Sequence, residues 1–451
     1  MLRRSRPRFK PCLPRPRRLR NAPGGSGETG EKGRTAVTQA VERVVIIGAG
    51  QAGGEAALRL RAGGFAGAIT LIGEEPLAPY QRPPLSKKYL AGEWGEDRLL
   101  LRDLEAYDHE RVTLRLNTAA TAIDRAAKSV RTNDGQDIPY DALILATGSR
   151  ARALPVAGAD LPGVHTLRTA ADVDAIRAHI RPGARLAVIG AGYIGLEVAA
   201  VARGLGLDVT VIEAAARPLS RVTSPEVSAF FLEHHTAQGV KFALSAQAAF
   251  IAGDKRVTGV GLKDGTEIPA DLVIVGVGIL PEVGLAQAAG LKTEDGIVTD
   301  GDTRTSDPAI FAIGDCARRP IPSYGGRSCR LESVHNAIEG AKLAAAAILN
   351  TPPPALEAPW FWSDQYDLKL QIAGLFQGYD RLVLRGEPGP QGFAAFYFEG
   401  ERLIAVDAVN RPAEFLGAKQ LIQKGQTVAF DRLQDMSTPM KEIVAQARPL
   451  S

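Results

Sequence analysis

The sequence predicts an α/β fold with three domains, and three features of the 451-residue chain support this. Two glycine-rich turns of the form Gly-x-Gly-x-x-Gly begin at Gly48 and Gly190, each directly after a short apolar run. An acidic residue, Glu74 or Glu213, ends or follows the next apolar run about 20 residues beyond each turn. After the proline run at 352–354, the sequence changes to short runs rich in apolar and β-branched residues. We therefore expect two Rossmann-like domains followed by a smaller α+β domain.

The three glycines of each turn have different physical roles. The first permits the sharp reversal from strand to helix, the second lets the backbone approach a pyrophosphate, and the third lets helix and strand pack closely. The N-terminal end of the helix then favours the negative charge of the phosphates. The alternative is a pair of tight turns followed by surface glutamates, since one match by chance is credible in a chain with 48 glycines. The two acidic residues favour the binding of two dinucleotides, which usually exchange hydride.

The order of apolar runs predicts that the second domain is inserted in the first. The elements expected to complete these two domains are strands at 140–148, 271–277 and 310–315 and a helix at 337–349. The elements expected beyond the prolines are strands at 369–375, 382–385, 394–398 and 403–409 and a helix at 415–424. The predicted domain bounds are 41–149 with 276–350, then 150–275 and 355–451, preceded by a tail at 1–40.

The positive charge of the chain is concentrated in this tail. Residues 1–20 contain nine Lys or Arg and no acid, and the rest of the chain has a net charge of −5. Nucleic-acid binding or a transit peptide would explain such a segment. Its prolines oppose an amphipathic helix, and we expect a disordered extension with no nucleic-acid partner. No membrane association is expected, because no apolar stretch reaches the ~18 residues that a membrane helix needs.

Cysteine and histidine usage excludes several kinds of site. Cys12, Cys316 and Cys329 are too few for a disulfide framework, which favours the cytoplasm, and too few to hold an iron–sulfur cluster by cysteine alone. The six histidines show no metal-binding spacing, so no metal site is expected. His234 and His235 are adjacent, and we expect them at solvated helix positions.

Five segments carry a more specific resemblance. They are Arg82–Lys87 (RPPLSK), Ala146–Gly148 (ATG), Gly190–Glu197 (GAGYIGLE), Gly314–Ala317 (GDCA) and Pro359–Tyr366 (PWFWSDQY). Through them, the chain from about residue 43 to residue 446 resembles the FAD-dependent ferredoxin reductase family. The RPPLSK and tryptophan segments are more specific to this family than the glycine turns are.

The resemblance implies that the first glycine turn binds FAD and the second binds NADH. The residues implied for FAD are Gly48, Gly50, Ala52, Gly53, Glu74, Lys87, Ala120, Arg168, Asp315 and Val334. The residues implied for NADH are Gly190, Gly192, Ile194, Gly195, Glu213 and Gly278. Glu213 is expected to bind the ribose diol and to repel a 2′-phosphate, which favours NADH over NADPH, although Arg217 and Arg221 could attract that phosphate. Outside the family, Asp315 could equally be a helix cap, and Ala120, Arg168 and Val334 ordinary core or surface residues.

The same resemblance assigns catalytic roles to Lys87, Glu197 and Trp362. Lys87 is expected beside the flavin ring, where its charge would stabilise the reduced, anionic form. Glu197 is flanked by apolar residues and needs a partner if buried, and the family supplies Lys87. Trp362 matches a tryptophan near the flavin where ferredoxin docks. The alternatives are a solvated lysine, a solvated glutamate and a tryptophan that anchors a domain interface.

The reaction expected from the resemblance depends on a missing cysteine. Disulfide reductases and NADH peroxidases of this superfamily carry cysteine near the flavin, but the corresponding stretch 79–90 has none. We therefore expect one-electron transfer from the flavin to a 2Fe-2S ferredoxin, which supplies a cytochrome P-450 monooxygenase or a Rieske-type oxygenase. The docking candidates are Arg102, Arg330, Lys342, Trp362 and Lys419. Two alternatives remain open, a flavin NADH oxidase and a redox-responsive interaction protein like apoptosis-inducing factor.

Overall fold

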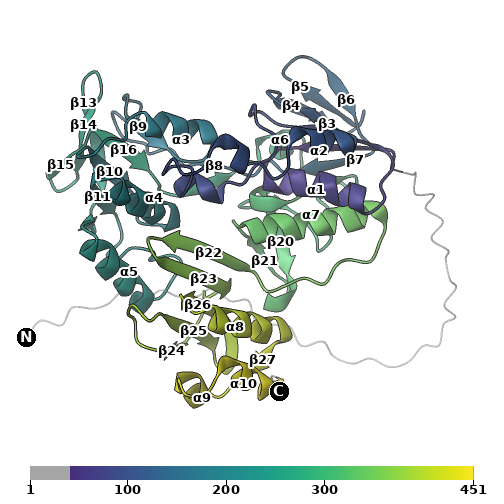
Figure 1. Ribbon diagram of the computed structural model, residues 1–451. Coiled ribbons are helices and arrows are strands. Elements are labelled where there is room, and N and C mark those ends of the chain that lie inside the picture. Colours follow the sequence, from purple (N-terminus) through teal and green to yellow (C-terminus); the bar gives the residue numbers. More distant parts are fainter. Residues whose placement is uncertain (1–40, 450–451) are drawn as a thin grey trace, which may run out of the picture. The chain divides into compact units, whose positions relative to one another are not determined.

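The computed structural model describes residues 41–449, and the predicted tail at 1–40 lies outside this part of the chain. A first parallel sheet has the strand order β19-β7-β1-β2-β3. Its strands are β1 (Arg43–Ile47), β2 (Ala68–Ile72), β3 (Val112–Arg115), β7 (Ala142–Leu145) and β19 (Ile310–Ala312). The central strands are apolar on both faces because both faces are covered. α1 (Gln51–Ala62) and α7 (Val334–Leu349) pack side by side over one face (Figure 1), and residues of segments 123–140 and 286–317 cover the other. The short helix α2 (Leu104–His109) precedes β3.

A second parallel sheet, with the order β12-β11-β10-β16-β9, is formed by the chain between β7 and β19. Its strands are β9 (Val164–Thr166), β10 (Arg185–Ile189), β11 (Asp208–Glu213), β12 (Lys241–Leu244) and β16 (Leu272–Val275). Its helices are α3 (Ala170–Arg177), α4 (Tyr193–Gly204) and α5 (Pro225–Ala237). The chain crosses between the two units through β8 (Ser149–Ala151) and β17 (Ile279–Pro281), which pair antiparallel. The second Rossmann-like unit is therefore an insertion in the first.

Small sheets that the sequence did not predict flank both units. The first comprises β4 (Ala120–Asp124), β5 (Ser129–Thr132) and β6 (Asp137–Pro139), and the second β13 (Ala248–Gly253), β14 (Val257–Leu262) and β15 (Glu267–Pro269). A third contains β18 (Ile297–Val298), β20 (Ala317–Ile321) and β21 (Arg327–Arg330), and α6 (Gly284–Ala288) precedes it. Their strands are short and most include polar residues or glycine, so they lack the continuous apolar runs by which the buried parallel strands were found.

The C-terminal domain is one antiparallel sheet of order β22-β23-β26-β25-β24 with helices against it. Its strands are β22 (Trp360–Gln365), β23 (Leu368–Gly374), β24 (Arg381–Arg385), β25 (Phe393–Glu399) and β26 (Arg402–Val409). The remaining elements are α8 (Pro412–Lys424), β27 (Gln426–Thr427), α9 (Phe430–Gln434), α10 (Met440–Ala445) and β28 (Arg448–Pro449). The four predicted strands and α8 are present, whereas β22 was not predicted as a strand. The predicted fold class is confirmed.

One apolar cluster brings the three units together. It contains Leu85 and Tyr89 from the loop after β2, Leu196 from α4, Phe231 from α5 and Phe393 from β25, with many others. β22 contacts both α4 and α7 (Figure 1). This packing places the loop that carries Lys87 against α4 and the C-terminal sheet. Among residues 41–449, no helix is both long and apolar enough to span a bilayer.

Candidate functional site

The first glycine turn has the geometry that its sequence predicts. Gly48 has φ +111°, and a Cβ there would lie 2.1 Å from the carbonyl oxygen of Ala146, so no other residue fits. A Cβ on Gly53 would lie 1.9 Å from the carbonyl oxygen of Gly48, which explains the close packing of α1 on the turn. Gly50 differs, because a Cβ there would meet no atom within 4 Å. It stands at the open N-terminus of α1.

The second turn repeats this geometry. Gly190 has φ +108°, and a Cβ there would lie 2.4 Å from the carbonyl oxygen of Gly276. A Cβ on Gly195 would lie 2.1 Å from the carbonyl oxygen of Gly190, and one on Gly192 would again meet nothing within 4 Å. α1 and α4 both begin at the middle glycine without a capping side chain. Their first N–H groups are therefore available to a ligand.

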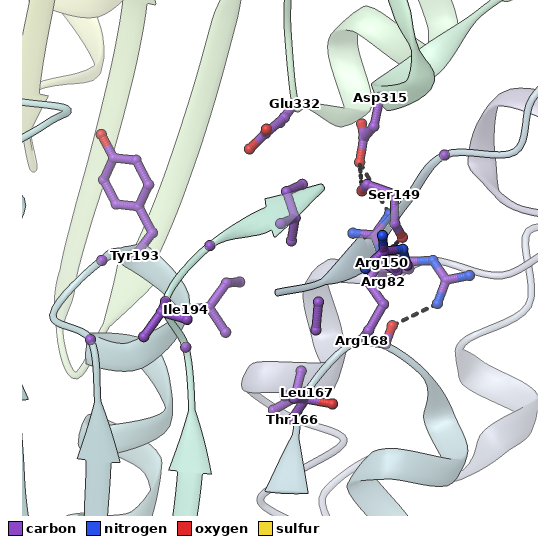
Figure 2. A pocket seen from close by; sticks show the side chains of 18 of the residues that line it. Arg82, Ser149, Arg150, Thr166, Leu167, Arg168, Tyr193, Ile194, Asp315 and Glu332 are labelled. Carbon is purple, nitrogen blue, oxygen red and sulfur yellow. Dashed lines mark hydrogen bonds and ion pairs between the residues drawn. The ribbon is translucent and has the colours of Figure 1, made fainter. Parts of the chain in front are cut away.

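One continuous cavity of about 2160 Å³ connects the two turns. The predicted residues that line it are Gly48, Gly50, Ala52, Glu74, Lys87, Ala120, Arg168, Gly190, Gly192, Ile194, Gly195, Glu197, Glu213, Gly278, Asp315, Arg330, Val334 and Trp362. Gly53 does not line the cavity, so its contribution to ligand binding is through packing. Figure 2 shows Tyr193 and Ile194 on one side and Asp315, Ser149 and the arginines Arg82, Arg150 and Arg168 on the other.

Only one carboxylate oxygen of Asp315, Oδ2, accepts hydrogen bonds from side chains of residues 41–449. Its Oδ2 accepts hydrogen bonds from Ser149 Oγ at 2.9 Å and Arg168 Nη2 at 3.1 Å (Figure 2). Within residues 41–449, Oδ1 makes no hydrogen bond, and the residue lines the cavity. Burial lowers the pKa of the Arg168 guanidinium, and Asp315 acts in the opposite direction. Oδ1 is therefore free to accept a hydrogen bond from a ligand hydroxyl, as the predicted role of Asp315 requires.

A second arginine, Arg82, forms an ion pair and hydrogen bonds at the same wall of the cavity. Arg82 Nη2 lies 2.7 Å from Glu75 Oε1, and its Nη1 donates to the carbonyl oxygen of Arg168 at 2.6 Å. Tyr80 donates to Glu75 Oε2 at 2.6 Å. This network fixes the start of the Arg82–Lys87 segment, so the position of Lys87 depends on residues outside that segment.

Glu213 is oriented by the backbone of the second turn. Its Oε2 accepts from the N–H of Ala191 at 2.7 Å, and its Oε1 accepts from the N–H of Ala215 at 2.8 Å. Arg217, which could have attracted a phosphate, instead donates to the carbonyl oxygens of Ser220, Thr223 and Ser224. Arg221 makes no ion pair within residues 41–449 and lines the cavity. Of the two arginines that could attract a phosphate beside the Glu213 carboxylate, only Arg221 therefore has a guanidinium that is not held by backbone carbonyl oxygens.

Lys87 and Glu197 meet between the two halves of the cavity. Lys87 Nζ lies 2.8 Å from Glu197 Oε2, and the carboxylate is only 1% exposed. Ser86 Oγ donates to the same Oε2 at 2.5 Å, and Ser363 Oγ donates to Oε1 at 2.6 Å. Three donors thus compensate the burial of the carboxylate. The pairing that the sequence predicted is present.

The predicted docking cations do not form a patch of free charge. Lys342 pairs with Glu339 at 3.1 Å, and Lys419 pairs with Glu357 at 2.6 Å and lies 5.4 Å above the Trp360 ring. Arg330 pairs with Glu332 at 2.6 Å and with Asp295 at 3.2 Å. Arg102 is exposed and has no carboxylate partner within residues 41–449. Arg102, Lys342 and Lys419 do not line the cavity.

The cysteines of the described chain take no part in the cavity. Cys316 is buried, and its Sγ donates to the carbonyl oxygen of Ile313 at 3.2 Å. Burial raises the pKa of this thiol. Cys329 is also a free thiol, and neither residue lines the cavity. Residues 41–449 contain no group of three or more His, Cys, Asp or Glu side chains that could hold a metal ion.

Comparison with known proteins identifies the family. The family model of pyridine nucleotide-disulphide oxidoreductases matches residues 42–341, and the reductase C-terminal model matches residues 360–444. The chain belongs to the pyridine nucleotide-disulphide oxidoreductase family. Rhodocoxin reductase of Rhodococcus erythropolis is 46% identical over 89% of this chain and 94% of its own length. Putidaredoxin reductase of Pseudomonas putida is 45% identical over 90% of this chain and 98% of its own length.

A solved structure supports the same relationship. The covalent complex of putidaredoxin reductase with putidaredoxin contains a chain that is 45% identical to this one, with a TM-score of 0.88. The match covers 91% of this chain and 99% of the other. The resemblance to ferredoxin reductases predicted from the sequence is confirmed, and the chain is an oxidoreductase of this family.

Several residues of the site were missed or misjudged from the sequence. His235 was expected in solvent, but it is wholly buried, and its Nε2 lies 2.7 Å from Gln365 Oε1. The contact depends on packing of α5 against the C-terminal sheet, which sequence spacing does not reveal. Ser363 and Gln365 were also missed. The alternation of side chains along a strand would have placed both on one face with Phe361, which packs on Tyr193 at 4.9 Å between ring centroids.

Proposed function

We propose that the protein is an NADH-dependent, FAD-containing reductase that transfers electrons one at a time to a 2Fe-2S ferredoxin. The single observation that carries this proposal is the continuous cavity lined by both glycine turns, with the Lys87–Glu197 pair between them. A cavity shared by two dinucleotide sites lets the reactive rings meet. The relatives named above are reductases of ferredoxin-type proteins, and one was solved with its protein partner.

The residues fit FAD in the first half of the cavity. The uncapped N-terminus of α1 would hold the pyrophosphate, and the open space at Gly50 leaves room for it. Glu74 would bind the adenosine ribose, and Asp315 Oδ1 would accept from a hydroxyl of the ribityl chain. Bound FAD supplies the chemistry of accepting one hydride, which carries two electrons, and releasing those electrons singly. Lys87 would place its positive charge beside the flavin ring, while Ala120, Arg168 and Val334 complete the walls.

The second half of the cavity fits NADH better than NADPH. The uncapped N-terminus of α4 would hold the pyrophosphate, with Ile194 and Gly278 beside the nicotinamide half. The Glu213 carboxylate would accept from the ribose diol, and a 2′-phosphate would meet its negative charge. Arg217 cannot offset that repulsion without breaking its bonds to three carbonyl oxygens.

The cavity residues also favour ferredoxin over the other predicted acceptors. Neither thiol of residues 41–449 lines the cavity, so these residues offer no cysteine for disulfide or peroxide reduction. Trp362 lines the cavity and lies 5.6 Å from Trp360 between ring centroids. We propose that ferredoxin docks on this side, and that it supplies a cytochrome P-450 monooxygenase or a Rieske-type oxygenase in the cytoplasm.

Coenzyme choice tests the assignment of the second half. In steady-state reduction of a 2Fe-2S ferredoxin, kcat/KM should be higher for NADH than for NADPH. Glu213→Ala should lower kcat/KM for NADH about 5- to 150-fold, the range for loss of a buried acceptor worth 1–3 kcal/mol. Glu213→Gln is the matched control, because it keeps an oxygen acceptor and removes only the charge. It should chiefly raise activity with NADPH. Equal kcat/KM for the two coenzymes in the unmutated enzyme would contradict the proposal.

A further inference from the structure

A chain of buried hydrogen bonds extends from Glu197 away from the cavity. Ser363 Oγ donates to Glu197 Oε1 at 2.6 Å, and Gln365 Nε2 donates to Ser363 Oγ at 3.1 Å. Gln365 Oε1 lies 2.7 Å from His235 Nε2. Ser363, Gln365 and His235 are at most 1% exposed. The chain joins the C-terminal sheet, which carries Ser363 and Gln365, to α4 and α5 of the inserted domain.

The direction of every bond in this chain follows from the carboxylate at its end. An ionised carboxylate only accepts, so Ser363 must give it its single hydroxyl proton. Ser363 can then only accept from Gln365, which must present its amide NH₂ to the serine. The amide oxygen of Gln365 therefore faces His235, and His235 must carry its proton on Nε2. All donors point toward Glu197.

The surroundings of His235 suit the neutral form that this direction requires. Its Nδ1 is buried and has no hydrogen-bond partner within residues 41–449. The rings of Tyr366 and Phe242 lie 5.0 Å and 6.2 Å away between centroids. Burial lowers the pKa of His235 to about 4. His235 is therefore a neutral donor near pH 7, and it adds no charge to the chain.

We propose that Ser363, Gln365 and His235 are positioning residues that hold Glu197 as an oriented anion against Lys87. Through this contact they influence the positive charge that Lys87 places beside the flavin. A single buried carboxylate thereby links all three domains to the redox centre. Ser86 completes the arrangement by donating to the oxygen that Lys87 contacts. The effect on the flavin rests on the proposed role of Lys87, whereas the direction of the chain does not.

The first test compares two buried serines. Ser363→Ala removes the donor to Glu197, and Ser228→Ala is the matched control. Ser228 is equally buried and donates at 2.5 Å, but to the carbonyl oxygen of Pro218. In the holoenzyme, Ser363→Ala should shift the midpoint potential of bound FAD and slow its reduction at saturating NADH about 3- to 10-fold, part of what a charged hydrogen bond is worth. Ser228→Ala should change neither. In a Lys87→Met background, the effect of Ser363→Ala on the potential should largely disappear.

The second test examines the direction of the hydrogen-bond chain and does not depend on the flavin. In ¹⁵N-histidine NMR spectra, His235 should show the neutral Nε2–H tautomer from pH 5 to pH 8, and Gln365→Leu should perturb that signal while Thr236→Ala, on the exposed side of α5, should not. An Nδ1–H tautomer, or protonation of His235 above pH 6, would contradict the proposed direction of the hydrogen bonds. Equal potential shifts in Ser363→Ala and Ser228→Ala would overturn the positioning role. Failure of NADH to reduce the flavin would instead count against the proposed function, because the tautomer would be unaffected.

Discussion

Individual glycines in this protein have separable roles, and the difference lies in what a Cβ would meet. At Gly53 it would enter the space of the Gly48 carbonyl oxygen, so this glycine stabilises the fold. At Gly50 it would project into open space that belongs to the cavity, so this glycine leaves room for the ligand that we propose there. The spacing of the glycines predicted both roles, and the geometry at each Cβ position agrees with them.

Two alanine substitutions test this division. Gly53→Ala should lower the free energy of unfolding of the apoprotein by about 1–3 kcal/mol, the usual effect of overpacking. Gly50→Ala should leave apoprotein stability within about 0.5 kcal/mol and weaken FAD binding. Thermal melting of the apoprotein and fluorescence titration with FAD measure the two effects. If Gly50→Ala bound FAD normally, the cradle assigned to α1 would be wrong.

Two kinds of helix N-terminus occur in the Rossmann-like units, one capped by a side chain and one that begins at glycine. α3, α5 and α7 begin at Thr169, Ser224 and Ser333, whose side chains accept from the backbone of the first turn. α1 and α4 begin at glycine and open into the cavity. Ser224 also lies in a buried contact between the inserted domain and the C-terminal sheet. There Asp407 of β26 accepts from Thr223 and, at 2.5 Å, from Tyr397.

The Asp407 contact gives an element-scale prediction with a defined pH dependence. Burial raises the pKa of Asp407 to about 6, from 3.8. The folded protein thus binds this proton more tightly than the unfolded chain. The contribution of protonated Asp407 to the free energy of unfolding is complete below pH 4. As the pH rises through 6, this contribution is lost, which lowers the free energy of unfolding by roughly 3 kcal/mol. Asp407→Asn cannot titrate at this position.

Thermal melting of the wild type and of Asp407→Asn between pH 4.5 and pH 7.5 tests the predicted direction of this pH dependence. The Tm of the wild type minus that of Asp407→Asn should fall as the pH rises. Other titrating groups, including His235, are present in both proteins and contribute equally. A Tm difference that is constant, or that grows with pH, would show that Asp407 is ionised throughout.

The sequence predicted elements well where burial produces long apolar runs. β1, β10 and β16 are buried on both faces, and their apolar runs identified them. β22 was missed because its sequence is a run of three aromatic residues followed by Ser, Asp and Gln, which is neither alternating nor continuously apolar. Its side chains contact two other domains, Trp360 through His335 of α7 and Phe361 through Tyr193 of α4. Lys87 and Glu197 could be paired only through the family resemblance. Ser363, Gln365 and His235 are brought to that pair by domain packing, which local sequence does not encode.

At the scale of the whole molecule, net charge is a poor guide to partner binding. The chain outside residues 1–20 has a net charge of −5, yet an acidic ferredoxin needs a positive face. Most predicted docking cations already have acidic partners: Arg330, Lys342 and Lys419 each form an ion pair. A charge reversal at these positions would change the surface charge and would also break an ion pair within the protein. Arg102 is exposed without such a partner in the described chain, so it offers the cleanest test.

Arg102→Glu should slow ferredoxin reduction about 3- to 10-fold at low salt, because it weakens electrostatic attraction during encounter. Turnover of NADH with ferricyanide should stay unchanged, since that acceptor needs no docking surface. Arg256→Glu, in the exposed turn between β13 and β14, is the matched control and should slow neither reaction. Equal ferredoxin rates for Arg102→Glu and the wild type at low salt would remove Arg102 from the docking surface.

We propose that one cavity receives a hydride from NADH and delivers its electrons singly to a ferredoxin. The most direct measurement is an anaerobic stopped-flow experiment in which the holoenzyme, limiting NADH and excess oxidised 2Fe-2S ferredoxin are mixed, and NADH, flavin and ferredoxin absorbance are followed together. We predict that flavin reduction precedes ferredoxin reduction and that two ferredoxins are reduced for each NADH consumed. Flavin reduction by NADH with no ferredoxin reduction, and electrons released only when oxygen is admitted, would contradict the account and would identify an NADH oxidase.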